Sequence, residues 1–116
     1  MTQRLITTAQ RAHLLANAQA YAAGQGYDAE PVTRLFTPDA RASWLLAALD
    51  PSDGNTAFGL CDVGVGLPGL GYVKLSDLES ITGPRGRPIL QDRYFQPTRT
   101  LREYVRLAQD NGAIVD

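Results

Sequence analysis

The segment Gly64–Gly69, with the sequence GVGLPG, fits the pattern G-x-G-x-x-G that is found in loops binding the phosphates of a dinucleotide. Such loops bind phosphate because the glycines lead into a helix, whose free N–H groups and dipole hold the pyrophosphate. Here Pro68 interrupts the motif, and Gly71–Leu75, GYVKL, has the apolar and aromatic character of a strand. The motif therefore predicts a reversal between two strands, with a type II turn over Leu67–Leu70, and no nucleotide cofactor is expected.

Nucleophilic catalysis would have to use the only histidine, His13, or the only cysteine, Cys61. His13 falls beside the apolar stripe of a predicted helix, which indicates a surface position. Cys61 falls within a predicted strand, where a free cysteine usually acts as a small buried apolar residue. One cysteine also excludes an intramolecular disulfide and a cysteine-rich zinc site. No catalytic residue, metal ligand or cofactor is therefore assigned.

Acidic side chains in the turn-rich run DPSDGN offer a second kind of chemistry. Asp50 and Asp53 lie close together there, and Asp62 would join them if the fold brought it near. Three carboxylates would make an acidic site for a small enzyme. Aspartate is also common in turns for structural reasons, which is the simpler interpretation. This loop and two leucines of the glycine-rich loop, Leu67 and Leu70, are also candidate contacts for a partner.

Arginine is concentrated in the last third of the chain. Residues 28–79 hold eight acidic and three basic side chains, a net charge of −5, whereas residues 84–107 hold six arginines and two acidic residues, a net charge of +4. Arginine beside aromatic residues is typical of protein interfaces, and the same combination contacts phosphates and bases. The candidate partner-binding residues are Arg85, Arg87, Arg93, Tyr94, Arg99, Arg102 and Arg106. Since the segment has no lysine, an acidic protein is preferred as the partner, with nucleic acid as the alternative.

A Ser or Thr followed three residues later by Gln or Glu indicates the start of a helix, because the two side chains can cap each other's backbone N–H groups. Three such pairs occur: Thr7 with Gln10, Ser76 with Glu79, and Thr100 with Glu103. Glycines should end the first and last of these helices, at Gly24 with Gly26 and at Asn111-Gly112.

Strands are predicted between these helices. They cover Val32–Thr37, Ser43–Leu49, Ala57–Val63, Gly71–Leu75 and a short stretch within Arg87–Phe95. The run RASWLLAALD could also form a short helix, but the turn-rich residues after it favour a hairpin of the second and third strands, closed by the loop Asp50–Thr56. The expected fold is a single α+β domain over residues 1–116. In it, a mainly antiparallel sheet of four to five strands packs against an N-terminal and a C-terminal helix.

Composition limits the class of protein. The chain has 116 residues, of which 44% are hydrophobic and 20% are charged, and its net charge is −1. These values are typical of one globular domain. No apolar run is long enough to cross a bilayer, and the N-terminal residues lack the apolar segment of a secretory signal. A cytoplasmic protein without membrane contact is therefore expected, and its oligomeric state is left open.

Several stretches resemble a small bacterial domain family of unknown function, which is typically encoded on conjugative plasmids and integrative elements. These stretches are LFTPDA, WLL, AFGLCDVG, LGYVKLSDLESITG and DRYF, and the resemblance covers about Leu5 to Leu107. The most specific are GYVKLSDLES, Gly71–Ser80, and DRYF, Asp92–Phe95. The resemblance implies no activity and no catalytic residues.

What the resemblance does imply is an accessory gene of mobile DNA, among which anti-restriction and other anti-defence proteins are common. The leading hypothesis is a non-enzymatic protein that binds a partner protein, as an anti-restriction or anti-CRISPR inhibitor does. A nucleic-acid-binding module that uses Arg85–Arg106 and a small enzyme with an acidic site are the alternatives.

Overall fold

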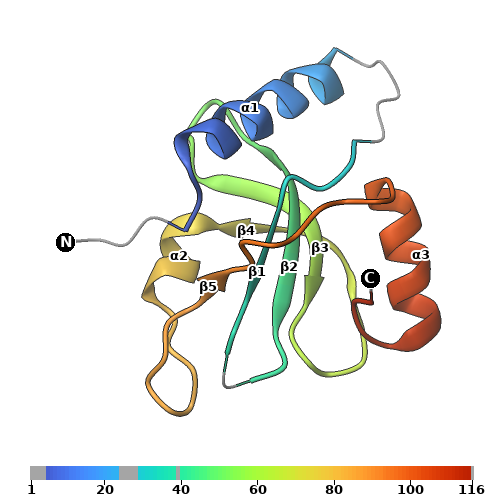
Figure 1. Cartoon of the computed structure of the whole chain (residues 1–116). Helices are drawn as coiled ribbons and strands as arrows, with labels where there is room; N and C mark the ends of the chain where they lie inside the picture. The colour runs from blue at the N-terminus through green and yellow to red at the C-terminus, as the bar shows by residue number, and fades with distance from the viewer. Residues whose placement is uncertain (1–4, 24–28, 39, 116) are drawn as a thin grey trace.

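Five antiparallel strands and three helices form the described part of the chain, which comprises residues 5–23, 29–38 and 40–115 of a computed structural model (Figure 1). In chain order they are α1 (Thr8–Ala22), β1 (Thr33–Phe36), β2 (Ser43–Leu49), β3 (Thr56–Asp62), β4 (Gly69–Lys74), α2 (Leu75–Ser80), β5 (Leu90–Gln91) and α3 (Leu101–Asn111). The strands lie in the order β4-β3-β2-β1-β5. The predicted α+β fold and the β2–β3 hairpin are confirmed.

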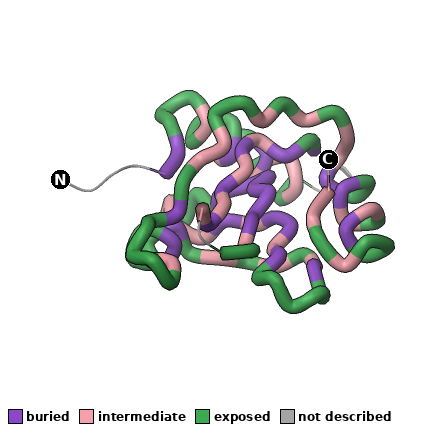
Figure 2. The backbone as a smooth tube through the Cα atoms, turned by 60° about the horizontal axis from the view of Figure 1, so that its bottom comes forward, coloured by how far each residue is buried: buried purple, intermediate pink, exposed green. Residues whose placement is uncertain are grey.

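Strand β2 is buried along its whole length because both faces of the sheet are covered. On one face Trp44 and Leu46 join a core with Leu14 of α1 and Leu78 of α2. On the other face α3 contributes a second core, whose members include Leu45, Leu60, Leu101, Tyr104 and Ala108. Figure 2 shows the result, with buried backbone in the central strands and exposed backbone on the helices and loops around them. The sheet is thus the middle of three layers.

The sheet bends sharply in β3 and β4 (Figure 1). Residues of β2 slip in register between Leu46 and Ala48, which marks a bulge. Opposite this bulge, Gly59 lies so close to β2 that an added Cβ would stand 1.9 Å from the carbonyl oxygen of Leu45. The carbonyl of Ala47 accepts a hydrogen bond from the buried Asn17 side chain of α1 at 2.8 Å. A glycine and a buried amide therefore accommodate the irregular backbone.

Two of the three predicted capping boxes are present. Thr7 with Gln10 and Thr100 with Glu103 cap α1 and α3, and α3 ends at the left-handed Gly112 as expected. The glycines predicted to end α1, Gly24 and Gly26, lie outside the described residues.

The capping box of Ser76 with Glu79 is wrong, because α2 begins at Leu75, two residues before the start that a Ser76 cap requires. Its first N–H groups are held from another part of the chain. The side-chain oxygen of Asn55 accepts a hydrogen bond from the Ser76 N–H at 3.0 Å, and the Asn55 carbonyl accepts one from Leu75 at 2.9 Å. The loop between β2 and β3 therefore supplies the cap.

The glycine-rich motif leads into strand β4 and not into a helix, as predicted. The type II turn over Leu67–Leu70 is wrong, however. Such a turn needs a positive φ at Gly69, whereas the glycines with positive φ in this loop are Gly64, at 83°, and Gly66, at 79°. The chain reverses at those two residues, and Gly69 already belongs to β4.

Candidate partner-binding surface

The acidic residues of the β2–β3 loop organise that loop. The Asp53 carboxylate accepts hydrogen bonds from the Thr56 hydroxyl at 2.6 Å and from the N–H groups of Thr56 and Asn55. These bonds lower the pKa of Asp53 to about 2, with the Thr56 hydroxyl as the largest cause. Asp50 accepts from the Ser52 N–H at 2.8 Å. Both carboxylates thus have structural partners.

Asp62 lies at the opposite end of the same strands. Ser43 pairs with Asp62 at one end of the β2–β3 ladder, and Leu49 pairs with Ala57 at the other. The buried Asp62 carboxylate accepts from the N–H groups of Gly64 and Ile114, which ties the chain after α3 to the β3–β4 loop. Asp62 therefore does not join Asp50 and Asp53, and the described residues contain no cluster of metal-ligating side chains.

The environments of the histidine and the cysteine give little support for nucleophilic catalysis. His13 is exposed on α1. Cys61 is half-buried in β3, and burial raises the pKa of its thiol. A raised pKa lowers the thiolate fraction at neutral pH, so the environment opposes nucleophilic reactivity.

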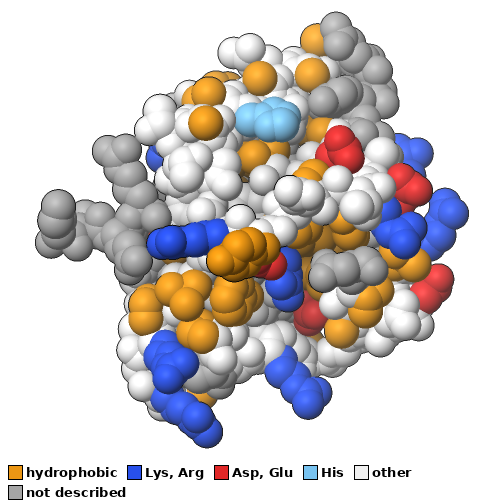
Figure 3. All heavy atoms as spheres, viewed as in Figure 1, with side chains coloured by type: hydrophobic (Ala, Val, Ile, Leu, Met, Phe, Trp, Pro, Cys, Tyr) orange, Lys and Arg blue, Asp and Glu red, His pale blue; other side chains and the backbone are white. Residues whose placement is uncertain are grey.

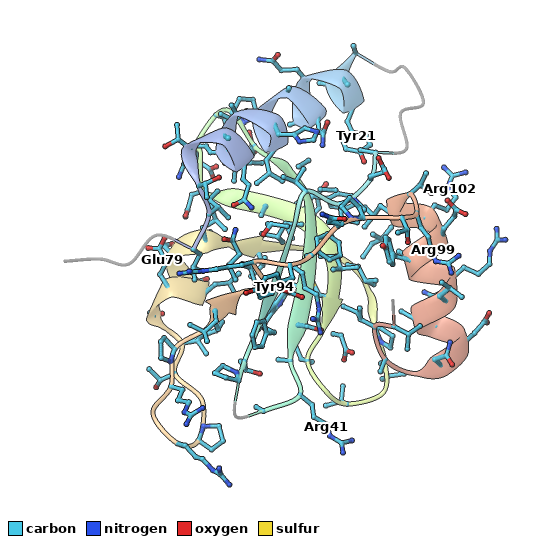
Figure 4. All side chains as sticks on the ribbon, viewed as in Figure 1. Tyr21, Arg41, Glu79, Tyr94, Arg99 and Arg102 are labelled. Carbon is cyan, nitrogen blue, oxygen red and sulfur yellow. The ribbon has the colours of Figure 1, made fainter. Side chains whose placement is uncertain are left out.

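The predicted arginines do not share one face. Arg85 and Arg87 are exposed in the loop between α2 and β5, whereas Arg102 and Arg106 are exposed on α3. Figure 1 shows that loop beside α2, on the far side of the sheet from α3, and Figure 4 places Arg99 and Arg102 together at α3. The structure thus divides the basic segment into separate groups, and Arg93 with Tyr94 lies between them.

The turn at Asp92–Phe95 has two residues that anchor it and two that project. The Asp92 carboxylate accepts from Arg34 Nη1 at 3.1 Å and from the Tyr94 N–H at 3.0 Å. The Phe95 ring packs beside that of Tyr104 of α3, with 6.4 Å between ring centres. Between these anchors Arg93 is exposed and Tyr94 is 93% exposed. The turn therefore holds an arginine and a tyrosine in solvent on a fixed backbone.

Two hollows flank this turn. One, of about 320 Å³, is lined by Arg34, Phe36, Gln91, Asp92, Arg93 and Tyr94. The other, of about 500 Å³, is lined by Thr7, Gln10, Val32, Thr33, Gln91, Asp92, Arg93 and Phe95. We call the residues of the first hollow the Tyr94 surface. In Figure 3 basic side chains are spaced around an apolar area at the front of the molecule, whereas basic and acidic side chains alternate near α3.

Arg34 belongs to this surface although the sequence did not single it out. Its guanidinium forms an ion pair with Asp92 at 3.1 Å and lies over the Phe36 ring, 5.8 Å from the ring centre. Its Nε is buried without a hydrogen-bond partner among the described residues. The residues around Arg34 in the sequence do not indicate this contact, because it depends on the pairing of β1 with β5, more than fifty residues away. One donor of Arg34 is thus unused at the edge of the hollow.

The candidate loop contacts lie elsewhere. Leu67 is in the β3–β4 loop and Leu70 in β4, and both are exposed. Strands β4 and β5 are the two opposite edges of the sheet, so these leucines and the Tyr94 surface are at different edges.

A comparison with known families matches residues 5–115 to the family described as "Protein of unknown function (DUF2958)". The chain belongs to this family. No curated protein and no solved structure shows significant similarity to it. The match covers all the described helices and strands of this DUF2958 domain, including the turn at Asp92–Phe95. None of the described helices has the length and apolar character needed to cross a bilayer.

Proposed function

We propose that this DUF2958 domain is a non-enzymatic binding protein that holds an acidic protein partner at the Tyr94 surface. One observation carries the proposal: Asp92 and Phe95 fix a turn whose other two residues, Arg93 and Tyr94, project into solvent. A tyrosine that is 93% exposed contributes little to folding. Tyrosine and arginine are the residue types that most often dominate the energy of protein interfaces.

Preorganisation supports this function. A turn that is already held in place loses little conformational entropy when it binds, so more of the contact energy appears as affinity. The adjacent hollow is lined by the apolar Phe36 and by the two arginines Arg34 and Arg93. That combination suits an aliphatic or aromatic side chain followed by a carboxylate.

A protein is favoured over a nucleic acid because the arginines do not form a track. Nucleic-acid grooves combine a continuous basic path with successive aromatic side chains on which bases stack. Here Arg102 and Arg106 are on α3 and Arg85 and Arg87 are beside α2, on opposite sides of the Tyr94 surface. Among the described residues of the Tyr94 surface, only Tyr94 offers a widely exposed ring.

The finer part of the proposal concerns the kind of partner. The resemblance to proteins of conjugative plasmids and integrative elements supports a role as an accessory protein of mobile DNA. An acidic component of a host defence system is then the partner, and the domain acts by occluding it.

The test is capture of partners from the native host by the tagged wild type and by Arg93→Glu and Tyr94→Ala. The matched control is Arg41→Glu, which reverses an exposed arginine in the loop between β1 and β2. We expect a host protein that is captured by the wild type and by the control Arg41→Glu. The variants Arg93→Glu and Tyr94→Ala should not capture it. With purified partner, Tyr94→Ala should raise Kd at least about tenfold, as expected for an interface hot spot.

Two outcomes would contradict the proposal. Equal retention by all four proteins would show that the Tyr94 surface is not the contact. Capture that nuclease abolishes, with an affinity that falls steeply with salt, would identify nucleic acid as the ligand.

A further inference from the structure

Strand β4 is an edge of the sheet that nothing among the described residues covers with another strand. Large apolar side chains are exposed along it and along the loop that precedes it. They are Val63, Val65, Leu67, Leu70 and Tyr72. Leu67 is 83% exposed and Tyr72 is 75% exposed. We call these five residues the hairpin patch.

The hydrogen bonds of β3 and β4 show which backbone groups of β4 are free. The Leu75 N–H donates to the Asn55 carbonyl at 2.9 Å, and β4 continues in regular antiparallel register from there. In an antiparallel ladder, every second residue of a strand directs its N–H and C=O groups towards the same neighbouring strand. Gly69, Gly71 and Val73 therefore face β3. The backbone groups of Leu70, Tyr72 and Lys74 point outward.

The features that usually prevent strand pairing occur only at the two ends of this edge, where Pro68 precedes β4 and Lys74 is its last residue. Natural edges are short, or carry charges, prolines or bulges. Strand β5, the other edge, has two residues, but β4 has six. Between Pro68 and Lys74 the strand has neither a charge nor a proline. It is therefore a template for another strand.

The sequence of β4 complements itself. If two copies pair in antiparallel register with the twofold axis at Gly71, Leu70 lies opposite the partner's Tyr72, and Gly69 lies opposite the partner's Val73. Leu70 and Tyr72 are both residues whose backbone groups point outward, so each such pair can exchange two N–H···O bonds. Both side chains lie on the face that α3 covers, and each large side chain on the other face meets a glycine.

We propose that a second copy of this chain occupies the β4 edge, so that two sheets join into one continuous sheet. The hairpin patch supports this occupant by its apolar character. Its five side chains are between 52% and 83% exposed, and a contiguous exposed apolar patch usually marks an interaction site. The twofold arrangement uses the same patch on both copies, as isologous dimers do. The proposal is independent of the Tyr94 surface, which lies at the other edge.

The first experiment measures mass by sedimentation velocity over a wide range of protein concentration. We expect a monomer–dimer equilibrium with Kd in the micromolar range. Leu70→Lys/Tyr72→Lys places like charges opposite each other across the axis and should be a monomer. Tyr94→Lys, at an exposed tyrosine of the opposite edge, is the matched control and should dimerise like the wild type. Far-UV circular dichroism shows whether each variant is folded.

The second experiment tests the register. Leu70→Glu/Tyr72→Glu should also be a monomer, but mixed with Leu70→Lys/Tyr72→Lys it should form a heterodimer, because each lysine then faces a glutamate. Hydrogen exchange gives a readout on the wild type alone. The amides of Leu70 and Tyr72 should gain protection as concentration rises, whereas those of Gly71 and Val73 should be protected at every concentration.

The proposal is overturned if the wild type remains a monomer at the highest concentration. It is also overturned if the folded lysine variant dimerises as the wild type does, or if the two charged variants fail to associate when mixed.

Discussion

Four of the aspartates in the described part of the chain accept hydrogen bonds from nearby backbone N–H groups. Asp50, Asp53, Asp62 and Asp92 each accept a hydrogen bond from the N–H two residues further along the chain. Each is the last residue of a strand, follows a strand directly or lies in the loop after one, where the chain leaves the sheet. This repeated turn, in which a carboxylate replaces a backbone carbonyl, explains why these acidic residues lie where the chain leaves the sheet.

Asp53 should make stability depend on pH in the acid range. The pKa of Asp53 is lowered from 3.8 to about 2 in the folded protein. A lowered pKa gives stabilisation that is present above the unfolded value and is lost as pH falls towards about 2. We therefore expect Asp53→Asn to have a lower urea midpoint than the wild type at neutral pH. The difference between the two midpoints should narrow at about pH 2. Asp110→Asn, on the exposed side of α3, is the control. A gap that stays constant with pH would contradict the role of the charge.

Gly59 is required by close approach and not by its φ angle. Its missing Cβ would stand 1.9 Å from the Leu45 oxygen, and the atoms that would have to move are backbone. Gly59→Ala should therefore cost about 3 kcal/mol or more, or prevent folding. Gly69→Ala, another glycine in a strand, meets nothing within 4 Å and should change stability by about 0.5 kcal/mol at most. Urea unfolding compares the two, and equal midpoints would contradict the requirement for close approach at Gly59.

Elements with local signals were predictable, and elements that depend on distant partners were not. The capping boxes of α1 and α3 lie within four consecutive residues, so the sequence shows them directly. Strand β2 was identified by its apolar run and by its turn-rich neighbour. The start of α2 was missed because its cap comes from Asn55, twenty-one residues away. The turn before β4 was predicted wrongly because Gly64, Gly66 and Gly69 can each adopt a left-handed φ, and the sequence does not show which of them do.

The cap of α2 gives a direct comparison. The Asn55 side chain accepts from the Ser76 N–H and donates to the Ser76 hydroxyl, both at 3.0 Å. Asn55→Ala removes the bond to the helix N–H and should cost about 1 kcal/mol, as other N-cap losses do. Ser76→Ala keeps that N–H and its acceptor, so it should cost only a few tenths of a kcal/mol. If α2 were instead capped by Ser76 and Glu79, the urea midpoints would fall in the reverse order.

At the scale of the molecule, the candidate surface was predictable in part. Arg93 and Tyr94 were identified from sequence, and the structure shows them projecting from a fixed turn. The division of the other arginines between α2 and α3 was not visible, because charge along a sequence does not show which side of a sheet each residue takes. Arg34 was missed for the same reason, since its ion pair with Asp92 depends on the pairing of β1 with β5.

The two cores on either side of the sheet should unfold together, because β2 contributes to both. Trp44 is buried in the core of α1 and α2, whereas Tyr104 is buried in the core of α3 and accepts a hydrogen bond from the Thr98 N–H. Tyr104→Ala should cost roughly 3–5 kcal/mol, as truncation of a large buried aromatic residue does. The fluorescence of Trp44 and the far-UV circular dichroism should report one shared, lowered midpoint in urea.

Tyr94→Ala, which removes an exposed tyrosine, is the matched control and should leave the midpoint near that of the wild type. If the Trp44 signal of Tyr104→Ala kept the wild-type midpoint while circular dichroism changed, the two cores would be separate units, and β2 would not couple them.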